Sequence, residues 1–173
     1  MPDPRLVSVI GKKNSGKTTL VVALVRELVR RGHRVMTIKH GAHPFDLDEK
    51  GRDTWRHVHE GGAERVVMET PGSRFLIARA DEEAGPRELT ARYLADAHFV
   101  VVEGFKKSDL PKIEVYRRAV HAQPLYDAAA PDASQYIAII TDASDYRASV
   151  PVLRFSDTNW LYRLVDLVSQ GAR

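Results

Sequence analysis

The chain has 173 residues, 43% hydrophobic and 28% charged, which is the length of a single domain with a sizeable core and an ordinary composition for a soluble protein. Its net charge of +3 is spread along the chain, which predicts no nucleic-acid partner but suits a small anionic ligand. The absence of cysteine excludes disulfides, thiolate zinc sites and iron–sulfur clusters, and the lack of a signal-peptide pattern or of an apolar run near ~18 residues predicts a cytoplasmic protein without a membrane partner.

The first predicted elements surround a phosphate-binding pattern. The apolar run Leu6–Ile10 reads as a strand, and Thr19–Arg31 has apolar residues at helical spacing up to the stop at Gly32. Between them, Gly11–Thr18 matches the P-loop pattern G-x-x-x-x-G-K-[ST] at every fixed position. A strand, a glycine-bounded loop and a helix N-terminus form an anion cradle, so we predict a nucleoside triphosphate site. The alternative is a chance match in a glycine-containing turn.

The residues of this loop have separate expected roles. Lys17 should reach the β- and γ-phosphates as a catalytic cation, and Thr18 should place its hydroxyl on Mg²⁺. The two fixed glycines let the backbone turn and approach the phosphates. The candidate nucleotide-binding residues are Gly11, Lys12, Lys13, Asn14, Ser15, Gly16, Lys17, Thr18 and Thr19.

The next predicted strand, Arg34–Lys39, leads into a loop that carries two histidines and two aspartates. These residues are His40, His43, Asp46 and Asp48. The loop leaves the carboxyl edge of the sheet, where ligands bind in such folds. Three interpretations stay open: a transition-metal site, a loop that positions Mg²⁺ or a partner's substrate, and a solvated loop. Asp46 is the member that we expect nearest the metal.

The middle of the chain predicts a helix, a hairpin and a second helix. Asp53–Glu60 reads as a short helix that ends at a Gly-Gly pair, and Pro86–Ala95 as a helix with proline in its first turn. The β runs Arg65–Glu69 and Arg74–Ala78 flank a Pro-Gly turn, which favours a hairpin. If these two runs join the main sheet, the sheet is mixed.

A strongly apolar strand, His98–Glu103, ends in an acidic residue. In P-loop proteins such a strand lies beside the P-loop strand, and its carboxylate holds Mg²⁺ or one of its waters. We therefore predict Glu103 as a metal and catalytic residue, with Gly104 close to the γ-phosphate; the alternative is a surface glutamate at an ordinary strand end. Lys106 follows in the loop, where it either faces phosphates or a partner, or is merely solvated.

The last third of the chain predicts three more strands and a closing helix. These are Lys112–Arg117, Tyr136–Thr141, Val152–Phe155 and the helix Asn159–Val168, with an irregular stretch at Ala119–Pro131. Asp142 or Asp145 could accept hydrogen bonds from guanine, although the Asn-Lys-x-Asp signature is missing. Alternating strands and helices predict one P-loop α/β domain over residues 1–173, with a mainly parallel sheet flanked by helices.

Taken together, these segments resemble the MobB family of molybdopterin-guanine dinucleotide biosynthesis adaptor proteins. The resemblance rests on VIGKKNSGKTTL, on TIKHGAHPFDLDEKGRDTWRHVHEGGA and on VVVEGFKKSDLPKIEVYR. It implies a dimeric GTP-binding protein with Mg²⁺, which assists the MobA-family guanylyltransferase that joins GMP to molybdopterin and itself hydrolyses GTP weakly. It also implies that the P-loop residues, Glu103 and Gly104 hold GTP and Mg²⁺, while His40, His43, Asp46 and Asp48 line the same face.

Two other functions fit the same residues. A small-molecule kinase or ATP-dependent ligase predicts ATP preference and turnover raised by an acceptor, but the sequence has no obvious arginine-rich lid. A switch GTPase predicts partner affinity that depends on the nucleotide state, but it would be expected to carry the Asn-Lys-x-Asp signature. The adaptor interpretation is therefore preferred.

Overall fold

The computed structural model describes residues 3–41, 48–80 and 82–171. Contacts within the chain define two compact units: Met1–His40 together with Gly85–Arg173, and Gly41–Ala84. The expectation of a single domain over residues 1–173 stays a prediction.

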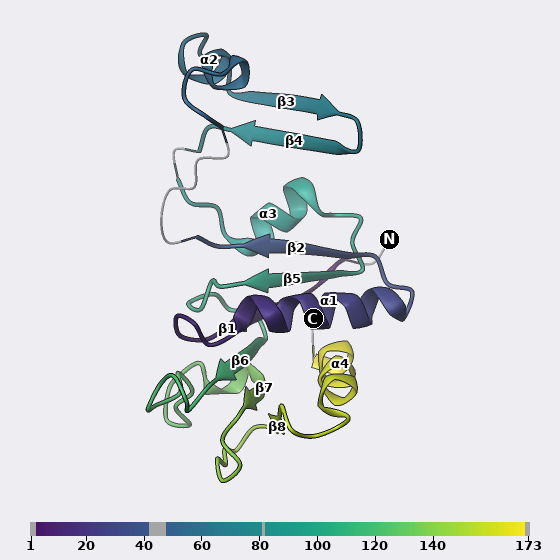
Figure 1. The fold of residues 1–173 in the computed structure, drawn as a ribbon, viewed down its shortest axis with the longest axis vertical. Helices are drawn as coiled ribbons and strands as arrows, with labels where there is room; N and C mark the ends of the chain where they lie inside the picture. Colours follow the sequence, from purple (N-terminus) through teal and green to yellow (C-terminus); the bar gives the residue numbers. More distant parts are fainter. Residues whose placement is uncertain (1–2, 42–47, 81, 172–173) are drawn as a thin grey trace. The chain divides into compact units, whose positions relative to one another are not determined.

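The first unit is built on a parallel sheet (Figure 1). Within the described residues the sheet has six strands in the order β2-β5-β1-β6-β7-β8, and every ladder between neighbours is parallel. The strands are β1 (Arg5–Ile10), β2 (Val35–Lys39), β5 (Phe99–Glu103), β6 (Lys112–Tyr116), β7 (Tyr136–Thr141) and β8 (Val152–Arg154). All six carboxyl ends therefore meet at one edge, and β1 lies between β5 and β6 at that edge.

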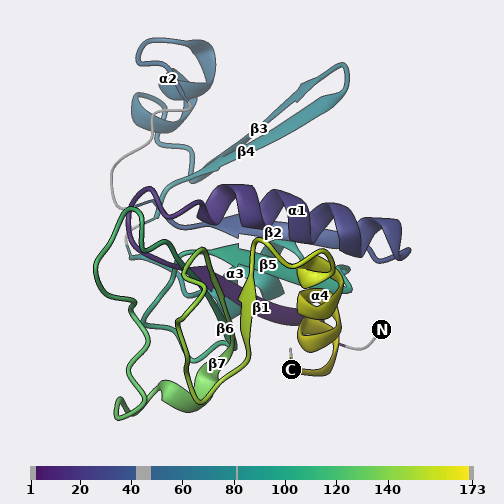
Figure 2. The ribbon, with the colours of Figure 1, turned by 60° about the horizontal axis from the view of Figure 1, so that its bottom comes forward.

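The helices of this unit cover both faces of the sheet (Figure 2). They are α1 (Lys17–Arg30), α3 (Pro86–Tyr93) and α4 (Trp160–Gly171), with a 3-10 turn at Ala133–Gln135. Leu24 of α1 and Leu164 of α4 belong to one apolar cluster with Val101 of β5. Val100, the next residue of β5, belongs to a second cluster against which Leu89 of α3 packs. Because successive strand residues point to opposite faces, α1 and α4 lie on one face and α3 on the other.

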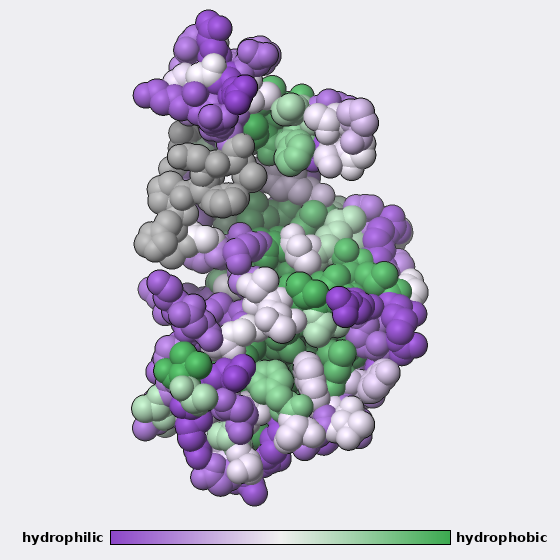
Figure 3. All heavy atoms as spheres, in the orientation of Figure 1, coloured by the Kyte–Doolittle hydropathy of each residue, from purple (hydrophilic) through white to green (hydrophobic). Residues whose placement is uncertain are grey.

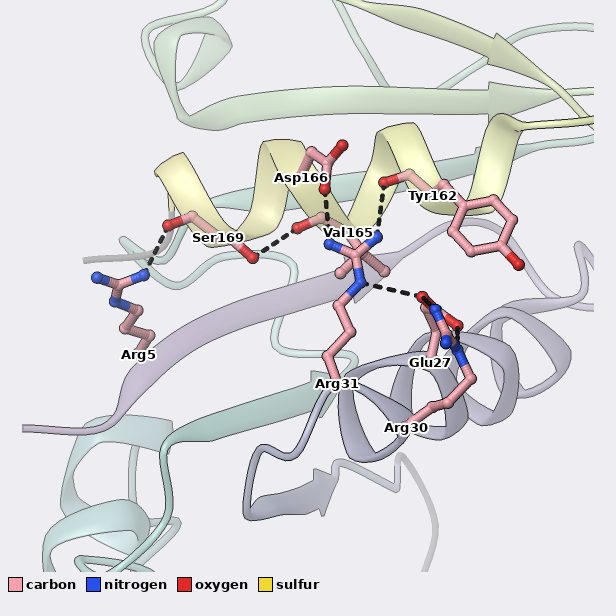
Figure 4. A network of polar contacts seen from close by, with 8 residues as sticks. All are labelled: Arg5, Glu27, Arg30, Arg31, Tyr162, Val165, Asp166 and Ser169. Atoms are coloured by element: carbon pink, nitrogen blue, oxygen red, sulfur yellow. Dashed lines mark hydrogen bonds and ion pairs between the residues drawn. The ribbon is translucent and has the colours of Figure 1, made fainter.

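A charged cluster joins α1 to α4 (Figure 4). Glu27, only 6% exposed, accepts hydrogen bonds from Arg30 and Arg31, and Arg31 also reaches Asp166 at 2.6 Å. These hydrogen bonds, the one from Arg30 first, lower the pKa of Glu27 to about 2. The cluster ties the C-terminal turn of α1, the helix that follows the P-loop, to the last helix of the chain.

The second unit contains α2 (Asp53–His59) and the antiparallel pair β3 (Arg65–Thr70) and β4 (Ser73–Ala78). The pair forms a two-stranded sheet of its own, so the hairpin is confirmed but does not make the main sheet mixed. Several of its large apolar side chains are exposed, and Figure 3 shows apolar surface on the hairpin. They are Val67 at 59%, Met68 at 44%, Phe75 at 45% and Leu76 at 44%.

The sequence-based elements agree with the structure to within a few residues. The α/β class and the mainly parallel sheet are confirmed, as is the irregular course of 119–131. In the parts of the chain that the structure describes, no helix is both long enough and apolar enough to span a bilayer.

Candidate nucleotide-binding site

The loop between β1 and α1 has the backbone of a phosphate cradle. Gly11 has φ +152°, and a Cβ there would lie 2.6 Å from both Ser15 Oγ and the carbonyl oxygen of Val115. Asn14 and Gly16 also have positive φ, at 61° and 96°. Among the described residues no side chain caps the N-terminus of α1, so its first backbone N–H groups are open to an anion.

The P-loop lysine lies over this loop. Lys17 Nζ donates to the carbonyl oxygen of Lys12 at 2.9 Å. Burial lowers the pKa of Lys17; the carboxylate of Glu103 opposes this shift and Lys39 adds to it. The ammonium is therefore held beside the position that phosphates would occupy, next to a second cation and one carboxylate.

Glu103 and Thr18 meet as the sequence predicts. Glu103 ends β5, pairs in register with Val9 of the P-loop strand, and is 9% exposed. Thr18 Oγ1 donates to Glu103 Oε1 at 2.9 Å, and Lys39 Nζ donates to the same oxygen at 2.8 Å. A hydroxyl and a carboxylate in contact are the oxygen ligands that Mg²⁺ takes, so this donor set fits the ion. Asp46, the third predicted metal residue, lies outside the described residues, as does His43.

The turn after β5 brings Gly104 and His40 together. Gly104 has φ +103°, and a Cβ there would lie 3.0 Å from His40 Cβ. Ser8 Oγ donates to the Gly104 carbonyl at 2.5 Å, and the His40 and Phe105 rings have centroids 4.5 Å apart. The predicted Gly104 and His40 therefore lie beside Glu103. The sequence does not predict the contacts of Ser8 with Gly104 and of Phe105 with His40, because these contacts depend on how the strands pack.

A segment of the predicted irregular stretch, residues 121–123, contacts the P-loop. Lys12 Nζ donates to the carbonyl oxygen of Gln123 at 2.7 Å, and His121 Nε2 lies 2.6 Å from the carbonyl oxygen of Lys13. Buried Glu114 on β6 holds this segment, because its carboxylate accepts from the backbone N–H groups of Leu125 and Tyr126. Burial raises the pKa of Glu114, against the effect of these two hydrogen bonds.

The other predicted site residues lie on the surface or in the second unit. Thr19 is exposed in the first turn of α1, and Lys106 is exposed in the loop after β5. Asp48 belongs to the second unit, where it accepts from the Thr54 hydroxyl at 2.6 Å, and its other oxygen is buried with no hydrogen-bond partner among the residues that the structure describes. Among the described residues no cluster of three or more His, Asp or Glu forms a metal site, and because His43 and Asp46 lie outside that part of the chain, the metal interpretation of their loop stays a prediction.

The loop considered for guanine follows β7. Asp142 accepts from Arg117 Nε at 2.9 Å and from the backbone N–H of Arg118 at 2.7 Å. Asp145 pairs with the guanidinium of Arg118. Arg118, Asp142 and Asp145 line an open depression of about 420 Å³. Both carboxylates thus have protein partners. A guanine base would have to displace these arginine contacts or bind beside them.

Known proteins resemble most of the chain. The family model of molybdopterin guanine dinucleotide synthesis protein B, MobB, matches residues 6–142. A molybdopterin-guanine dinucleotide biosynthesis adapter protein from Haemophilus influenzae is 29% identical over 94% of this chain and 86% of its own length. Its Escherichia coli counterpart is 32% identical over 64% of each chain.

Solved structures agree on the fold. The structure of Bacillus subtilis MobB has a TM-score of 0.68 at 23% identity and covers 98% of each chain. A MobB homologue from Bacillus stearothermophilus has a TM-score of 0.63 at 25% identity, covering 95% of this chain and 98% of its own. With the family model spanning most of the chain, including the P-loop and the Glu103 strand, the protein belongs to the MobB family.

Proposed function

We propose that this protein is a nucleotide-binding adaptor in molybdopterin guanine dinucleotide biosynthesis that binds GTP with Mg²⁺ at the P-loop. The observation that carries the proposal is the contact between Thr18 and Glu103. Thr18 lies in the first turn of α1, whose N-terminus has no side-chain cap in the described part of the chain, and it follows Lys17 in the chain. A metal ligand pair, a phosphate cradle and a cation together match the requirements of a magnesium–triphosphate complex.

The same site supports binding more than rapid turnover. Fast hydrolysis requires a group that orients the attacking water, and often an arginine that stabilises the transition state. We assign no residue to either role. Lys17 and Glu103 would act by holding the phosphates and the ion, so we propose at most a slow GTPase.

The partners follow from the family. The named relatives are adapter proteins of the same pathway, which supports contact with a MobA-family guanylyltransferase and, through it, with molybdopterin. His40, beside Gly104, and Lys106, in the following loop, are the residues of the first unit that we propose for this partner face, and the role of Asp48 and His43 in partner binding stays a prediction from the sequence. We also propose that the protein acts in the cytoplasm as a homodimer.

Calorimetric titration with GTP and with ATP, each in Mg²⁺, tests the proposal. We expect binding with GTP preference, negligible turnover, and loss of at least about a hundredfold in affinity in Lys17→Ala, because removing a partly buried charged partner of the phosphates costs several kcal/mol. Far-UV circular dichroism controls for folding. Unchanged affinity in Lys17→Ala would refute the P-loop site, and ATP preference with acceptor-stimulated turnover would favour the kinase or ligase alternative.

A further inference from the structure

Lys39 and Thr18 share one oxygen of Glu103. Lys39 is the last residue of β2 and pairs in register with Glu103, the last residue of β5. Its Nζ lies 2.8 Å from Glu103 Oε1, the atom that also accepts the Thr18 hydroxyl at 2.9 Å. The Lys39 ammonium therefore contacts the oxygen that the proposed site offers to magnesium.

The two members of this ion pair differ in exposure. The side chain of Glu103 is 11% exposed, whereas that of Lys39 is 65% exposed. A carboxylate with so little water needs a nearby cation, because an unpaired charge in a poorly solvated place is costly. An exposed lysine, by contrast, leaves an ion pair at little cost, since water solvates its ammonium. The pair is thus suited to exchange of its cation.

We infer that Lys39 is the exchangeable counter-ion of the magnesium site. In the ligand-free protein Lys39 pairs with Glu103, and Lys17 adds a second positive charge nearby. When magnesium–triphosphate binds, Glu103 becomes a ligand of the divalent ion and the ammonium of Lys39 leaves the carboxylate. The reason is electrostatic, because two cations on one carboxylate oxygen repel each other in a partly desolvated site. The inference rests on the proposed function, and it adds that a residue of this chain sets the magnesium concentration needed for nucleotide binding.

The backbone allows this exchange without rearranging the sheet. Residues Val35 to Lys39 pair with Phe99 to Glu103 along the whole of β2, and the N–H of His40 donates to the Glu103 carbonyl at 2.9 Å. Only the side chain of Lys39 needs to move. Gly41–Ala84, the second unit, begins two residues after Lys39 in the chain.

The first test measures the exposure of the Lys39 amine by limited acetylation and mass spectrometry on the full chain. With GTP and Mg²⁺ we expect acetylation of Lys39 to rise at least about threefold, because the amine is released to solvent, and with GTP and EDTA to stay at the ligand-free level. Lys107, exposed in the loop after β5, is the internal control and should not change. No change at Lys39, or protection of it by magnesium–GTP, would overturn the inference; protection would make it a phosphate ligand.

The second test uses Lys39→Gln and the Mg²⁺ concentration at which GTP binding is half-maximal. Removing the competing cation should lower this concentration by roughly fivefold, the factor expected for one ion pair. Lys39→Arg should keep the wild-type Mg²⁺ requirement. Lys107→Gln removes the same charge from a residue outside the site and should also leave this requirement unchanged. An unchanged or raised Mg²⁺ requirement in Lys39→Gln would contradict the exchange.

A third measurement separates this inference from the proposed function. In ligand-free protein, Glu103→Gln should raise acetylation of Lys39 at least about threefold, because the charged partner is gone. That result needs no nucleotide. If no GTP or ATP binds to any variant, the proposed function fails and the exchange fails with it, while this measurement still reports the ion pair; if nucleotide binds but Lys39 does not respond to Mg²⁺, only the exchange fails.

Discussion

At the scale of single residues, the site depends on backbone positions that only glycine can occupy. Gly11 combines φ +152° with two neighbours, Ser15 Oγ and the Val115 carbonyl, that lie where its Cβ would be. Gly104 has φ +103° and lies against His40. Both glycines follow central strands at the carboxyl edge, so their lack of a side chain lets the backbone pass closely where phosphates would bind.

Gly11→Ala should therefore damage both the fold and the site. We expect a loss of about 1–3 kcal/mol in free energy of unfolding, from backbone strain and overlap, and at least about tenfold weaker GTP binding. Chemical denaturation and calorimetry measure the two effects. Gly85→Ala is the matched control, because Gly85 has an ordinary φ of −72° and open space at its Cβ position. Equal effects of the two variants would contradict the steric role of Gly11.

The sequence predicts some site residues better than others. The spacing of the P-loop identifies Lys17 and Thr18, because the chemistry of that loop is local in the chain. Glu103 was recognisable as the acidic end of an apolar strand. Lys39 had no such signal: its role appears only when β2 and β5 align in register and bring its ammonium to Glu103.

At the scale of elements, the P-loop helix is fixed at its far end by charge. α1 carries Glu27 at a nearly buried position, an unusual place for a glutamate. Arg31 continues the network to Asp166 on α4, and Ser169 of α4 accepts from Arg5 of β1 through its carbonyl at 2.6 Å (Figure 4). The apolar periodicity of α1 and α4 predicted both helices, but not this contact, because it joins residues more than a hundred positions apart.

Stability against acid should depend on Glu27. Its folded pKa, about 2, lies below the ordinary value of about 4.3, so the folded state favours the ionised carboxylate. Its stabilising contribution is therefore complete above about pH 4.3 and is lost as the pH falls towards 2. Glu27→Gln should lower the melting temperature near neutral pH, and the difference from wild type should shrink between about pH 4 and pH 2.

Thermal melts across this pH range, monitored by circular dichroism, measure the difference. Glu88→Gln is the control, since Glu88 pairs with Arg92 on the surface of α3, with both side chains about half exposed. That variant should change the melting temperature little at any pH. A difference in melting temperature between Glu27→Gln and wild type that grows on acidification would contradict the stabilising role of the ionised Glu27.

At the scale of the whole molecule, sheet topology makes the site from distant segments. The ends of β1, β2, β5 and β6 lie on one edge, so the P-loop, Lys39, Glu103 and the segment held by Glu114 come together although they span more than a hundred residues. The alternation of strands and helices predicts this parallel arrangement. It does not predict that the segment at 121–123 would contact the P-loop, because that segment has neither periodicity nor a motif.

The hairpin of the second unit bears on the proposed dimer. A two-stranded sheet is marginal in water by itself, and β3–β4 exposes large apolar residues on both faces. Met68 and Phe75 are directly paired across the strands on one face, and Val67 and Leu76 on the other. Exposed apolar residues gathered on one element favour a protein partner, and we propose that this partner is a second copy of the chain.

Met68→Ser combined with Phe75→Ser should then weaken the dimer. Losing two buried apolar side chains from an interface should raise the dissociation constant by at least about a hundredfold. Analytical ultracentrifugation over a range of protein concentrations measures it, and circular dichroism checks folding. Val22→Ser is the matched control, because Val22 is 51% exposed but belongs to α1 of the first unit and not to the hairpin. A monomeric wild type would refute the dimer, whereas a dimer that resists the hairpin substitutions but dissociates in the control would place the interface on α1.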